Sequence, residues 1–536
     1  MRGTWISRLR AGAKALLRDQ RGNAFMLTAA AIVPVIGIVG SAVDIGRAYM
    51  TQLRLQQACD SGVLAGRRAM TGATYSDDAE AEANKMFNFN FPEAKYGASG
   101  ILFSSEADDD ASDVIGQASA ILPTELMFIF GKDQFRLTAN CTAKLEISNV
   151  DVMMVLDVTG SMAEKNSGDT LTRMEGLQAA SKSFFATLTS AHIGDGQLRF
   201  GVVPYSSTVN VGGILHDADP SWLSETVTLP SRSYRRVNIC NQYGYNCSLQ
   251  WRYVYEDRDL AVGSIAPGDD LTFNTGTNGA NVTAEWGGCI VERATKAFGP
   301  TETAPSDAYD MDIDMVPTTD VKTQWQPMLQ PFAFERGQVA SRTTTSSNLG
   351  QTLYTACPHP ARKLEIMTKD DQAEFDEYID DLEPVGGTYH DVGMAWGARL
   401  ISPTGLFASE NEKAESNERP ISRHILFMTD GAMDARPTIY SHQGMERSQP
   451  RVGASDDASA RARHTNRFLQ LCRAARQRGI TVWVISFGDD SSSSSNLANL
   501  NNCASSGAAF EADDADELNE QFQAIARQIS KLRLSQ

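Results

Sequence analysis

The sequence lacks the short motifs by which common enzymes and zinc sites are usually found. It contains no GxSxG, HExxH or GxxxxGK[ST] pattern, and none of its eight cysteines forms a CxxC pair. An excess of basic residues is also missing: 48 Lys and Arg stand against 66 Asp and Glu, for a net charge of −18. Because nucleic-acid surfaces need clustered positive charge, this balance argues against a nucleic-acid partner.

One segment has no charged residue at all. Ala24–Val43 runs for twenty residues without Asp, Glu, Lys or Arg, and about 20 helical residues cross a bilayer core of ~30 Å. Six basic residues and a single acid, Asp19, precede this run. Because basic residues favour the cytoplasmic side, we expect a cytoplasmic tail at 1–23, a transmembrane helix at 24–43 and the rest of the chain outside the cytoplasm.

A cleaved secretory signal is the alternative for this segment, with Gly40-Ser41-Ala42 as a small-residue cleavage site. The apolar run is longer than the usual apolar part of a signal peptide. The helical pattern also continues beyond it through Tyr49, Leu53 and Val63. We therefore favour an uncut anchor that extends into a stalk helix.

The cysteines fit an exported chain, because an even number of them favours disulfides outside the cytoplasm. Neighbourhood within the expected domains suggests the pairs Cys59–Cys141, Cys240–Cys247, Cys289–Cys357 and Cys472–Cys503. Connectivity cannot be deduced from a sequence alone, and buried free thiols are the alternative.

Two domains are expected after the anchor. Residues 44–148 read as a stalk helix and a small α+β domain, with a helix break and cap at Tyr75–Asp78 and strands at Asp113–Ile121 and Phe135–Ile147. Residues 149–536 alternate strands with helices, which predicts an α/β fold with a doubly wound, mainly parallel sheet. Its expected strands are Val152–Leu156, Leu198–Tyr205, His424–Thr429 and Thr481–Phe487. Its expected helices lie near 172–190, 370–382, 391–401 and 457–478. A last helix is expected to carry Leu518, Phe522, Ile525 and Ile529 on one apolar face. The alternation of strands and helices is interrupted at about 212–360, and we interpret this segment as an insertion at one edge of the sheet.

Oxygen-bearing side chains follow the expected strand ends of the α/β domain. Asp157, Thr159 and Ser161 come after the first buried strand, Asp430 follows another, and Thr388 stands in a Gly-Gly-Thr turn that opens a helix. Ligands of open α/β sheets bind beyond the carboxyl ends of the strands. Two carboxylates and three hydroxyls are the hard oxygen donors that Mg²⁺ (or Mn²⁺) prefers, and an incompletely neutralised cation would accept a carboxylate from a partner. Each fragment alone is weak, because Asp before Gly is usual turn chemistry.

This pattern resembles the metal-ion-dependent adhesion site of the von Willebrand factor type A (vWA) family, DxSxS…T…D. The resemblance implies a Rossmann-like vWA domain in which the hydroxyls of Thr159, Ser161 and Thr388 touch the metal, while Asp157 and Asp430 act directly or through water. Thr159 replaces the more usual serine but keeps the hydroxyl. A vWA-like fold whose site is unused remains the alternative.

The N-terminal segment resembles TadE/TadG-like proteins of the tight-adherence (Flp) pilus machinery, whose TadG-like members join such an anchor to a C-terminal vWA domain. The likeness rests on Arg21-Gly22, Pro34, Asp44, Gly46-Arg47, Leu55-Gln56 and Ala58-Cys59-Asp60, with further matches at Gly287–Ile290, Cys357-Pro358, Gly393–Arg399 and Asn502–Ser505. It implies a bacterial inner-membrane protein of pilus assembly or surface attachment, whose partner is a pilus or envelope component that offers an acidic residue. Relatives cut by prepilin peptidase carry a Glu where Leu27 stands, so cleavage at Gly22 is not expected.

Other candidates favour plain structural roles. Asp307, Asp310, Asp312 and Asp314 lack the order of a Ca²⁺ loop and are expected, like Asp108–Asp110, in solvated acidic loops. The serine run 491–495 is expected in a solvated loop. His390 has no paired nucleophile and acid, so a surface or capping role is expected.

Three hypotheses follow. The first is a non-enzymatic, Mg²⁺-dependent binding and assembly protein, with Asp157, Thr159, Ser161, Thr388 and Asp430 as its metal site. The second is a hydrolase in which the metal activates water, which needs a nearby base and a substrate pocket. The third is a structural envelope component with an unused site.

Overall fold

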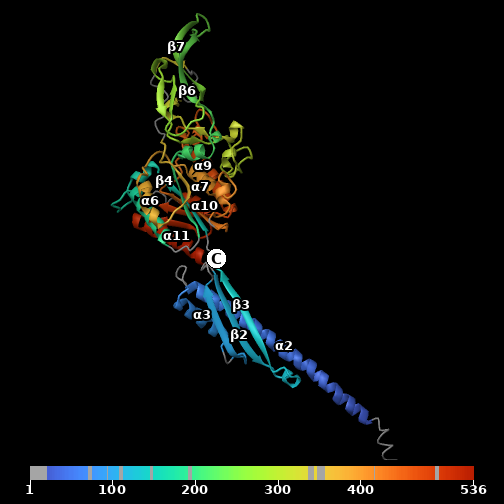
Figure 1. Cartoon of the computed structure of the whole chain (residues 1–536). Coiled ribbons are helices and arrows are strands. Elements are labelled where there is room, and N and C mark those ends of the chain that lie inside the picture. The colour runs from blue at the N-terminus through green and yellow to red at the C-terminus, as the bar shows by residue number, and fades with distance from the viewer. Residues whose placement is uncertain are drawn as a thin grey trace, which may run out of the picture. The chain divides into compact units, whose positions relative to one another are not determined.

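The computed structural model describes residues 21–69, 75–92, 95–107, 113–144, 149–190, 196–335, 343–346, 356–415, 417–488 and 494–535. The chain forms two compact units, Met1–Glu146 and Ile147–Gln536 (Figure 1). The basic residues Arg2–Arg18, the acids Asp108–Asp110 and the serines 491–493 lie outside the described residues.

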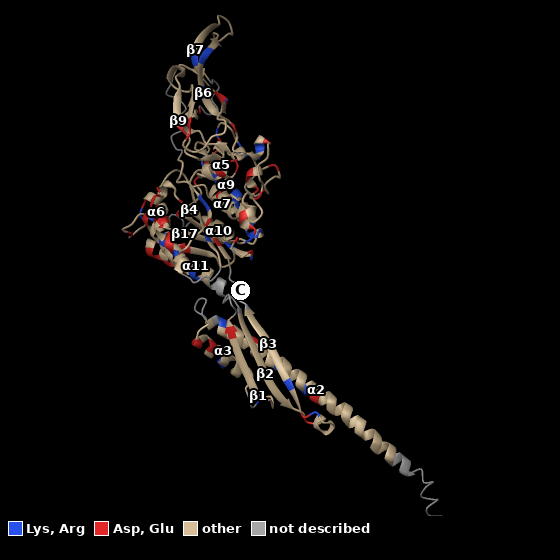
Figure 2. Ribbon diagram, viewed as in Figure 1, with Lys and Arg blue, Asp and Glu red and all other residues tan. Residues whose placement is uncertain are grey.

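The first unit is built on α2 (Arg21–Ala69), a continuous helix of 49 residues that contains Pro34. Its part Met26–Arg67 is, among the described residues, the one helix long and apolar enough to cross a membrane by length and composition. From Met26 to Val43 this helix contains no Asp, Glu, Lys or Arg, and the corresponding ribbon is tan in Figure 2. The apolar anchor and its helical continuation thus form a single helix, as expected.

A second helix and a small sheet pack on α2. Helix α3 (Asp77–Asn90) begins where expected, because the Ser76 hydroxyl accepts a hydrogen bond from the Ala79 N–H. The antiparallel sheet has the order β1-β2-β3, formed by β1 (Ser99–Ala107), β2 (Asp113–Pro123) and β3 (Gln134–Lys144). A Cys59–Cys141 disulfide joins α2 to β3.

Two residues of α2 on which the TadE/TadG-like resemblance rests, Asp44 and Gln56, accept or donate hydrogen bonds that join the helix to this sheet. The Asp44 carboxylate is 1% exposed and accepts hydrogen bonds of 2.8–2.9 Å from the backbone N–H groups of Glu125, Leu126 and Met127. These groups open the short 3₁₀ helix η1 (Met127–Phe130) between β2 and β3. The Gln56 amide donates to the Asn140 carbonyl of β3 at 2.9 Å. Both side chains therefore fix the sheet to the helix.

The second unit contains the predicted sheet. Its order is β13-β5-β4-β14-β17-β18, and every neighbouring pair is parallel except β13 with β5. The strands are β4 (Asn149–Asp157), β5 (Leu198–Tyr205), β13 (Arg362–Ile366), β14 (Ile421–Thr429), β17 (Thr481–Phe487) and β18 (Ala509–Ala512). Numbered along the chain, this is the doubly wound order 3-2-1-4-5-6. The predicted fold class is confirmed.

Helices cover both faces of this sheet (Figure 1). One face holds α4 (Arg173–Ser190), α6 (Gln372–Asp380) and α11 (Ala515–Ser535); the other holds α7 (His390–Ile401), α9 (Asp457–Gln477) and α10 (Ser494–Cys503). Two glycines let α7 approach closely, because a Cβ at Gly397 would lie 2.4 Å from Val155 Cγ2 and one at Gly393 would lie 2.6 Å from Tyr205 Cδ1. Ser494 and Ser495 belong to α10, so the loop expected there is wrong for these two serines.

The insertion leaves β5 and returns at β13, the edge strand. It contains α5 (Gly212–Ala218), β6 (Thr226–Ile239), β7 (Ser248–Ala261), β8 (Asp270–Phe273), β9 (Val282–Glu285), β10 (Ile290–Val291), β11 (Gln326–Pro327), β12 (Thr343–Thr344) and the 3₁₀ helices η3 (Pro220–Trp222), η4 (Thr277–Gly279), η5 (Tyr309–Met311), η6 (Val321–Thr323) and η7 (Gln330–Phe332). After it come η8 (Lys369–Asp371), α8 (Ala408–Asn411), β15 (Tyr440–Ser441) and β16 (Gly444–Met445). Trp325 of the insertion lies against Trp396 of α7, with ring centroids 5.1 Å apart, so the insertion shares the core of the α7 face.

Disulfides tie the second unit together in three places. Cys240–Cys247 closes the β6–β7 hairpin, Cys289–Cys357 joins two parts of the insertion, and Cys472–Cys503 joins α9 to α10. With Cys59–Cys141, these are the four pairs that neighbourhood in the sequence suggests.

Candidate metal centre

The five oxygen-bearing side chains meet at the carboxyl edge of the sheet. Asp157 ends β4, and Asp430 directly follows the adjacent parallel strand β14. In the order 3-2-1-4-5-6 these are strands 1 and 4, the pair between which the strand order reverses. The short 3₁₀ helix η2 (Gly160–Ala163) follows β4 and carries Ser161.

A turn between α6 and α7 brings Thr388 to the same edge. The Gly160 N–H donates to the Gly386 carbonyl at 3.0 Å, which joins this turn to the loop after β4. Gly386 has φ +76°, and a Cβ there would lie 3.0 Å from the Ser206 hydroxyl. A residue without Cβ is therefore needed at this position.

The three hydroxyls and Asp430 form one continuous chain of oxygen atoms. Thr388 Oγ1 lies 3.2 Å from Thr159 Oγ1, which lies 3.1 Å from Ser161 Oγ. Ser161 Oγ in turn donates to Asp430 Oδ1 at 2.9 Å. Asp157, Thr159, Thr388 and Asp430 are buried, and Ser161 is half-buried. The structure thus brings all five predicted residues into one cluster.

Asp157 is held by protein donors on both carboxylate oxygens. Oδ1 accepts from the Thr159 N–H at 2.9 Å, and Oδ2 accepts from the hydroxyls of Thr429 at 2.7 Å and Tyr205 at 3.3 Å. Its charge therefore acts on the cluster at close range.

The site also contains a basic residue that no sequence pattern indicates. Arg173, in the first turn of α4, is 4% exposed and places Nη1 3.2 Å from Asp430 Oδ2. Its Nε donates to Asn166 Oδ1 at 2.7 Å, which fixes the guanidinium plane. No motif links Arg173 to Asp430, and only the packing of α4 across β4 and β14 brings them together.

The electrostatics of the cluster favour a cation. Burial raises the pKa of Asp157, and the neighbouring charge of Asp430 raises it further. Burial also raises the pKa of Asp430, although the hydrogen bond from Ser161 and the charge of Arg173 oppose this. Two carboxylates are buried here beside one arginine, which pairs with Asp430, so the pair takes up a proton or a cation more readily than separate exposed carboxylates do. This hard, anionic donor set fits Mg²⁺ or Mn²⁺.

His390 is not the surface or capping residue that the sequence predicts. It is 3% exposed, and its Nε2 lies 3.0 Å from the Thr429 hydroxyl, which itself donates to Asp157. Burial lowers the pKa of His390 to about 4. The neutral imidazole therefore holds the Thr429 hydroxyl, and this hydroxyl in turn holds the Asp157 carboxylate.

The acidic run 307–314 is not a simple solvated loop. Asp310 is 4% exposed and bonded to Arg467 and Gln443, and Asp314 accepts from Arg478 at 2.6 Å. Asp307 and Asp312 are exposed, as expected. Asp310 and Asp314 instead attach the insertion to α9 and to the residue that follows it.

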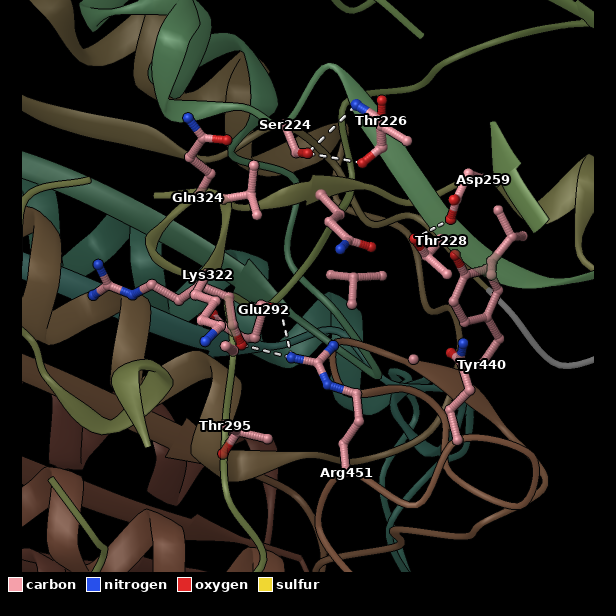
Figure 3. A pocket seen from close by; sticks show the side chains of 18 residues that line it. Ser224, Thr226, Thr228, Asp259, Glu292, Thr295, Lys322, Gln324, Tyr440 and Arg451 are labelled. Carbon is pink, nitrogen blue, oxygen red and sulfur yellow. Dashed lines mark hydrogen bonds between the residues drawn. The ribbon is translucent and has the colours of Figure 1, made fainter. Parts of the chain in front are cut away.

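A separate polar cavity of about 520 Å³ lies within the second unit (Figure 3). Residues of the insertion, including β6, line it together with β15, β16 and the segment that follows them, among them Thr228, Lys322 and Arg451. The Arg451 guanidinium donates to the backbone carbonyls of Glu292 and Arg293 at 2.7 and 2.6 Å. None of the five residues of the oxygen cluster lines this cavity.

Comparison with known families identifies the N-terminal segment. Residues 22–74 match the family described as putative Flp pilus-assembly TadE/G-like. The anchor segment is TadE/TadG-like. The resemblance seen in the sequence is thus confirmed for this part of the chain, and the strand order of the second unit agrees with the vWA-like fold. No curated protein matches the chain in sequence.

Several solved structures share a distant likeness. The pilus adhesin SpaC from Lactobacillus rhamnosus GG is 11% identical with a TM-score of 0.33, and the match covers 81% of this chain and 34% of SpaC, about a third of its length. The PilB minor pilin from Streptococcus sanguinis is 10% identical with a TM-score of 0.32, over 80% of this chain and 78% of PilB. The vWF domain of the type V pili tip protein Mfa5 from Porphyromonas gingivalis is 12% identical with a TM-score of 0.32, over 73% and 97%. Similarity this low establishes neither function nor partner for this chain.

Proposed function

We propose that this chain is a membrane-anchored pilus-assembly or adhesion protein that binds a protein partner through a Mg²⁺-dependent site outside the cytoplasm. The observation that carries the proposal is the cluster of three hydroxyls and two carboxylates at the point where the strand order reverses. The TadE/TadG-like match supplies the pilus context. We place the anchor in the bacterial inner membrane with residues 1–23 in the cytoplasm, because basic residues precede the apolar run.

In this proposal Thr159, Ser161, Thr388 and Asp430 would hold the ion, and Asp157 would add charge through its hydrogen-bonded neighbours. Bound Mg²⁺ supplies a coordination position that a carboxylate oxygen of the partner can take. Arg173 holds Asp430 in place by pairing with its second oxygen. The hydroxyls of Thr429 and Tyr205 hold Asp157 by donating hydrogen bonds to it, and His390 contacts the Thr429 hydroxyl. These are binding and positioning roles, and we propose no catalytic residue.

The test uses the full-length protein in detergent with bacterial envelope extract. Wild type should capture a partner with Mg²⁺ and lose it in chelator. Asp157→Asn and Asp430→Asn should each reduce capture about tenfold or more, the effect expected when about 1.4 kcal/mol or more of binding is lost. Asp370→Asn changes an exposed acid of η8 and serves as the matched control.

Equal capture by wild type and both variants in chelator would reject the proposal. The same proteins test the hydrolase alternative, because metal-dependent turnover of ester, peptide or phosphate substrates that disappears in Asp430→Asn would favour it. Normal pilus assembly with both aspartates replaced would favour a structural component with an unused site.

A further inference from the structure

A second cluster of side chains that are able to bind a metal ion, Asp391, His442 and His464, lies close to the turn that carries Thr388. Asp391 is in the first turn of α7, His442 lies between β15 and β16, and His464 is on α9. Their exposed fractions are 3%, 2% and 3%. They are far apart in the sequence and form no motif, so only the fold brings them together.

The distances within this imidazole cluster fit a shared ion. His464 Nδ1 lies 2.7 Å and His442 Nε2 lies 3.3 Å from Asp391 Oδ2, and all three potential ligand atoms lie within 4.8 Å of one another. Ligand atoms at ~2.0–2.1 Å from a tetrahedral zinc ion are separated by roughly 3.3 Å. The observed separations therefore need only small adjustments to admit an ion.

The tautomer of His442 points to a cation between these groups. His442 Nδ1 lies 3.3 Å from the Ser207 carbonyl oxygen, which can only accept a hydrogen bond. Nδ1 therefore carries the proton, and in the neutral ring Nε2 presents its lone pair to the Asp391 carboxylate. Two lone pairs facing each other at this distance repel unless a metal ion or an extra proton lies between them.

Asp391 differs from the other buried acids around it. Glu292 pairs with Arg399 at 2.7 Å, and Asp310 pairs with Arg467. Among the described residues, Asp391 forms ion pairs with the two histidines alone, and its Oδ1 has no hydrogen-bond partner. A carboxylate buried in this way needs a compensating positive charge.

A small cavity of about 10 Å³ adjoins the cluster and is lined by Asp391 and His442. Asp310 Oδ1 and Gln443 Oε1, from two further lining residues, also have no donor within the described part of the chain. The cavity has room for about one water molecule. A water there could donate its two hydrogens to these oxygens while its own oxygen faces the cluster.

We propose that Asp391, His442 and His464 bind a zinc-type divalent cation, with a water in the small cavity as the fourth ligand. Two imidazoles and one carboxylate suit zinc better than Mg²⁺, so this site is chemically distinct from the oxygen cluster. The ion would join three segments: α7, the connection between β15 and β16, and α9. The insertion is attached to the second of these, because the Glu292 N–H donates to the His442 carbonyl at 2.7 Å.

Cobalt uptake tests this proposal on the full-length protein in detergent. After removal of metals, Co²⁺ is added to wild type and to Asp157→Asn, in which the oxygen cluster is disabled. Both should bind one Co²⁺ with the intense visible absorption of a tetrahedral site, and Zn²⁺ should displace it and raise Tm. His464→Gln and His442→Gln should lose the absorption, whereas His216→Gln, which changes a half-buried histidine of α5, should keep it.

Absence of Co²⁺ absorption in folded wild type and Asp157→Asn would overturn the proposal, because protons would then fill the gap between the rings and the carboxylate. X-ray absorption of the zinc-loaded Asp157→Asn protein gives a second readout that needs no histidine variant. Histidine nitrogens around zinc support the site, and a shell of oxygens alone overturns it.

A second inference concerns η1, the connection between β2 and β3, and rests on the proposed membrane anchor. Phe128, Ile129 and Phe130 are 54%, 59% and 48% exposed. They lie beside the apolar run of α2, because a Cβ at Gly37 would be 3.1 Å from Phe130 Cζ. Gly37 precedes Val43 by six residues, or about 9 Å along a helix. A bilayer around the apolar run would therefore also surround this connection.

We infer that Phe128–Phe130 enter the outer leaflet of the membrane that α2 crosses. Apolar and aromatic side chains at this depth suit the interfacial region of lipid, and the hydrogen bonds from the η1 backbone to Asp44 fix the depth. The first unit thus has two membrane contacts, α2 and η1.

A photo-crosslinking amino acid placed at single positions of the full chain in cells tests this inference. Position 129 should yield phospholipid adducts, whereas position 102, a 70% exposed leucine on β1, should not. Position 33 of the apolar run reports the anchor itself. Lipid adducts at 33 without adducts at 129, or protein adducts at 129, would overturn the inference and leave the anchor intact; no adduct at 33 would reject the anchor.

Discussion

The two faces of the central sheet in the second unit are built from different chemistry. The face under α4, α6 and α11 is mainly apolar: Phe184 and Phe375 pack on Phe200 of β5, and Phe522 packs on Phe184. The face under α7 and α9 buries ion pairs of the insertion, including Glu292–Arg399. Apolar packing stabilises the sheet from both faces, and the α7 face in addition holds the insertion and the imidazole cluster through buried charged groups.

This difference predicts that removing one buried charge on the α7 face lowers the stability of the protein by a large amount. Glu292 is buried and accepts from Arg399, Trp396 and Trp325 at 2.7, 2.8 and 3.0 Å. Arg399→Met removes the ion-pair partner of this buried carboxylate and should lower the free energy of unfolding by about 3–5 kcal/mol. Chemical denaturation measures this loss.

Arg235→Met is the matched control, because it removes the Arg235–Glu256 pair, in which Arg235 is 54% exposed. Its expected effect is about 1 kcal/mol or less. Equal effects of both changes would show that burial does not distinguish the two pairs.

A smaller effect is expected from the buried histidine of the apolar face. His424 of β14 accepts a hydrogen bond from Trp483 Nε1 at 3.2 Å, and burial lowers its pKa from 6.5 to about 4. Below pH 6.5 His424 binds a proton in the unfolded chain but stays neutral in the folded chain. The free energy of unfolding should therefore fall as the pH drops towards 4. The slope approaches about 1.4 kcal/mol per pH unit.

His424→Gln should flatten this part of the pH–stability curve, as measured by Tm between pH 7 and 4, whereas His216→Gln should leave it unchanged. A curve for His424→Gln identical to that of wild type would show that His424 is not the group responsible.

The smallest effect is expected at the oxygen cluster itself. Thr388→Val keeps the shape of the side chain but removes the hydroxyl that lies 3.2 Å from Thr159 Oγ1. We expect a loss of about 1 kcal/mol of Mg²⁺-dependent stabilisation, with little change in chelator. Thr272→Val on the exposed side of β8 is the control. A Mg²⁺ response unaltered in Thr388→Val would exclude this hydroxyl as a ligand.

The sequence predicted the elements whose information is local. Apolar runs marked β4 and β14, the Leu518–Ile529 stripe marked α11, and Gly479, with φ +76°, ends α9. Because the carboxyl ends of parallel strands share one edge, strand assignment was enough to bring Asp157 and Asp430 together.

The remaining features depend on contacts between distant segments. Arg173 reaches Asp430 across 257 residues, and Gln443 and Arg467 reach Asp310 across 133 and 157. The sequence does not indicate burial of His390, because its partner, Thr429 of β14, lies 39 residues further along the chain. Contacts of this kind produce no periodic pattern and no motif in the sequence. The attachment of the insertion and the imidazole cluster therefore could not be predicted from the sequence.

Anomalous scattering from crystals of the protein grown with Mn²⁺ tests the central claim most directly. The account predicts a peak bordered by the hydroxyls of Thr159, Ser161 and Thr388 and by Asp430. An ordered oxygen cluster without any peak, or manganese bound at Asp391, His442 and His464 alone, would contradict it.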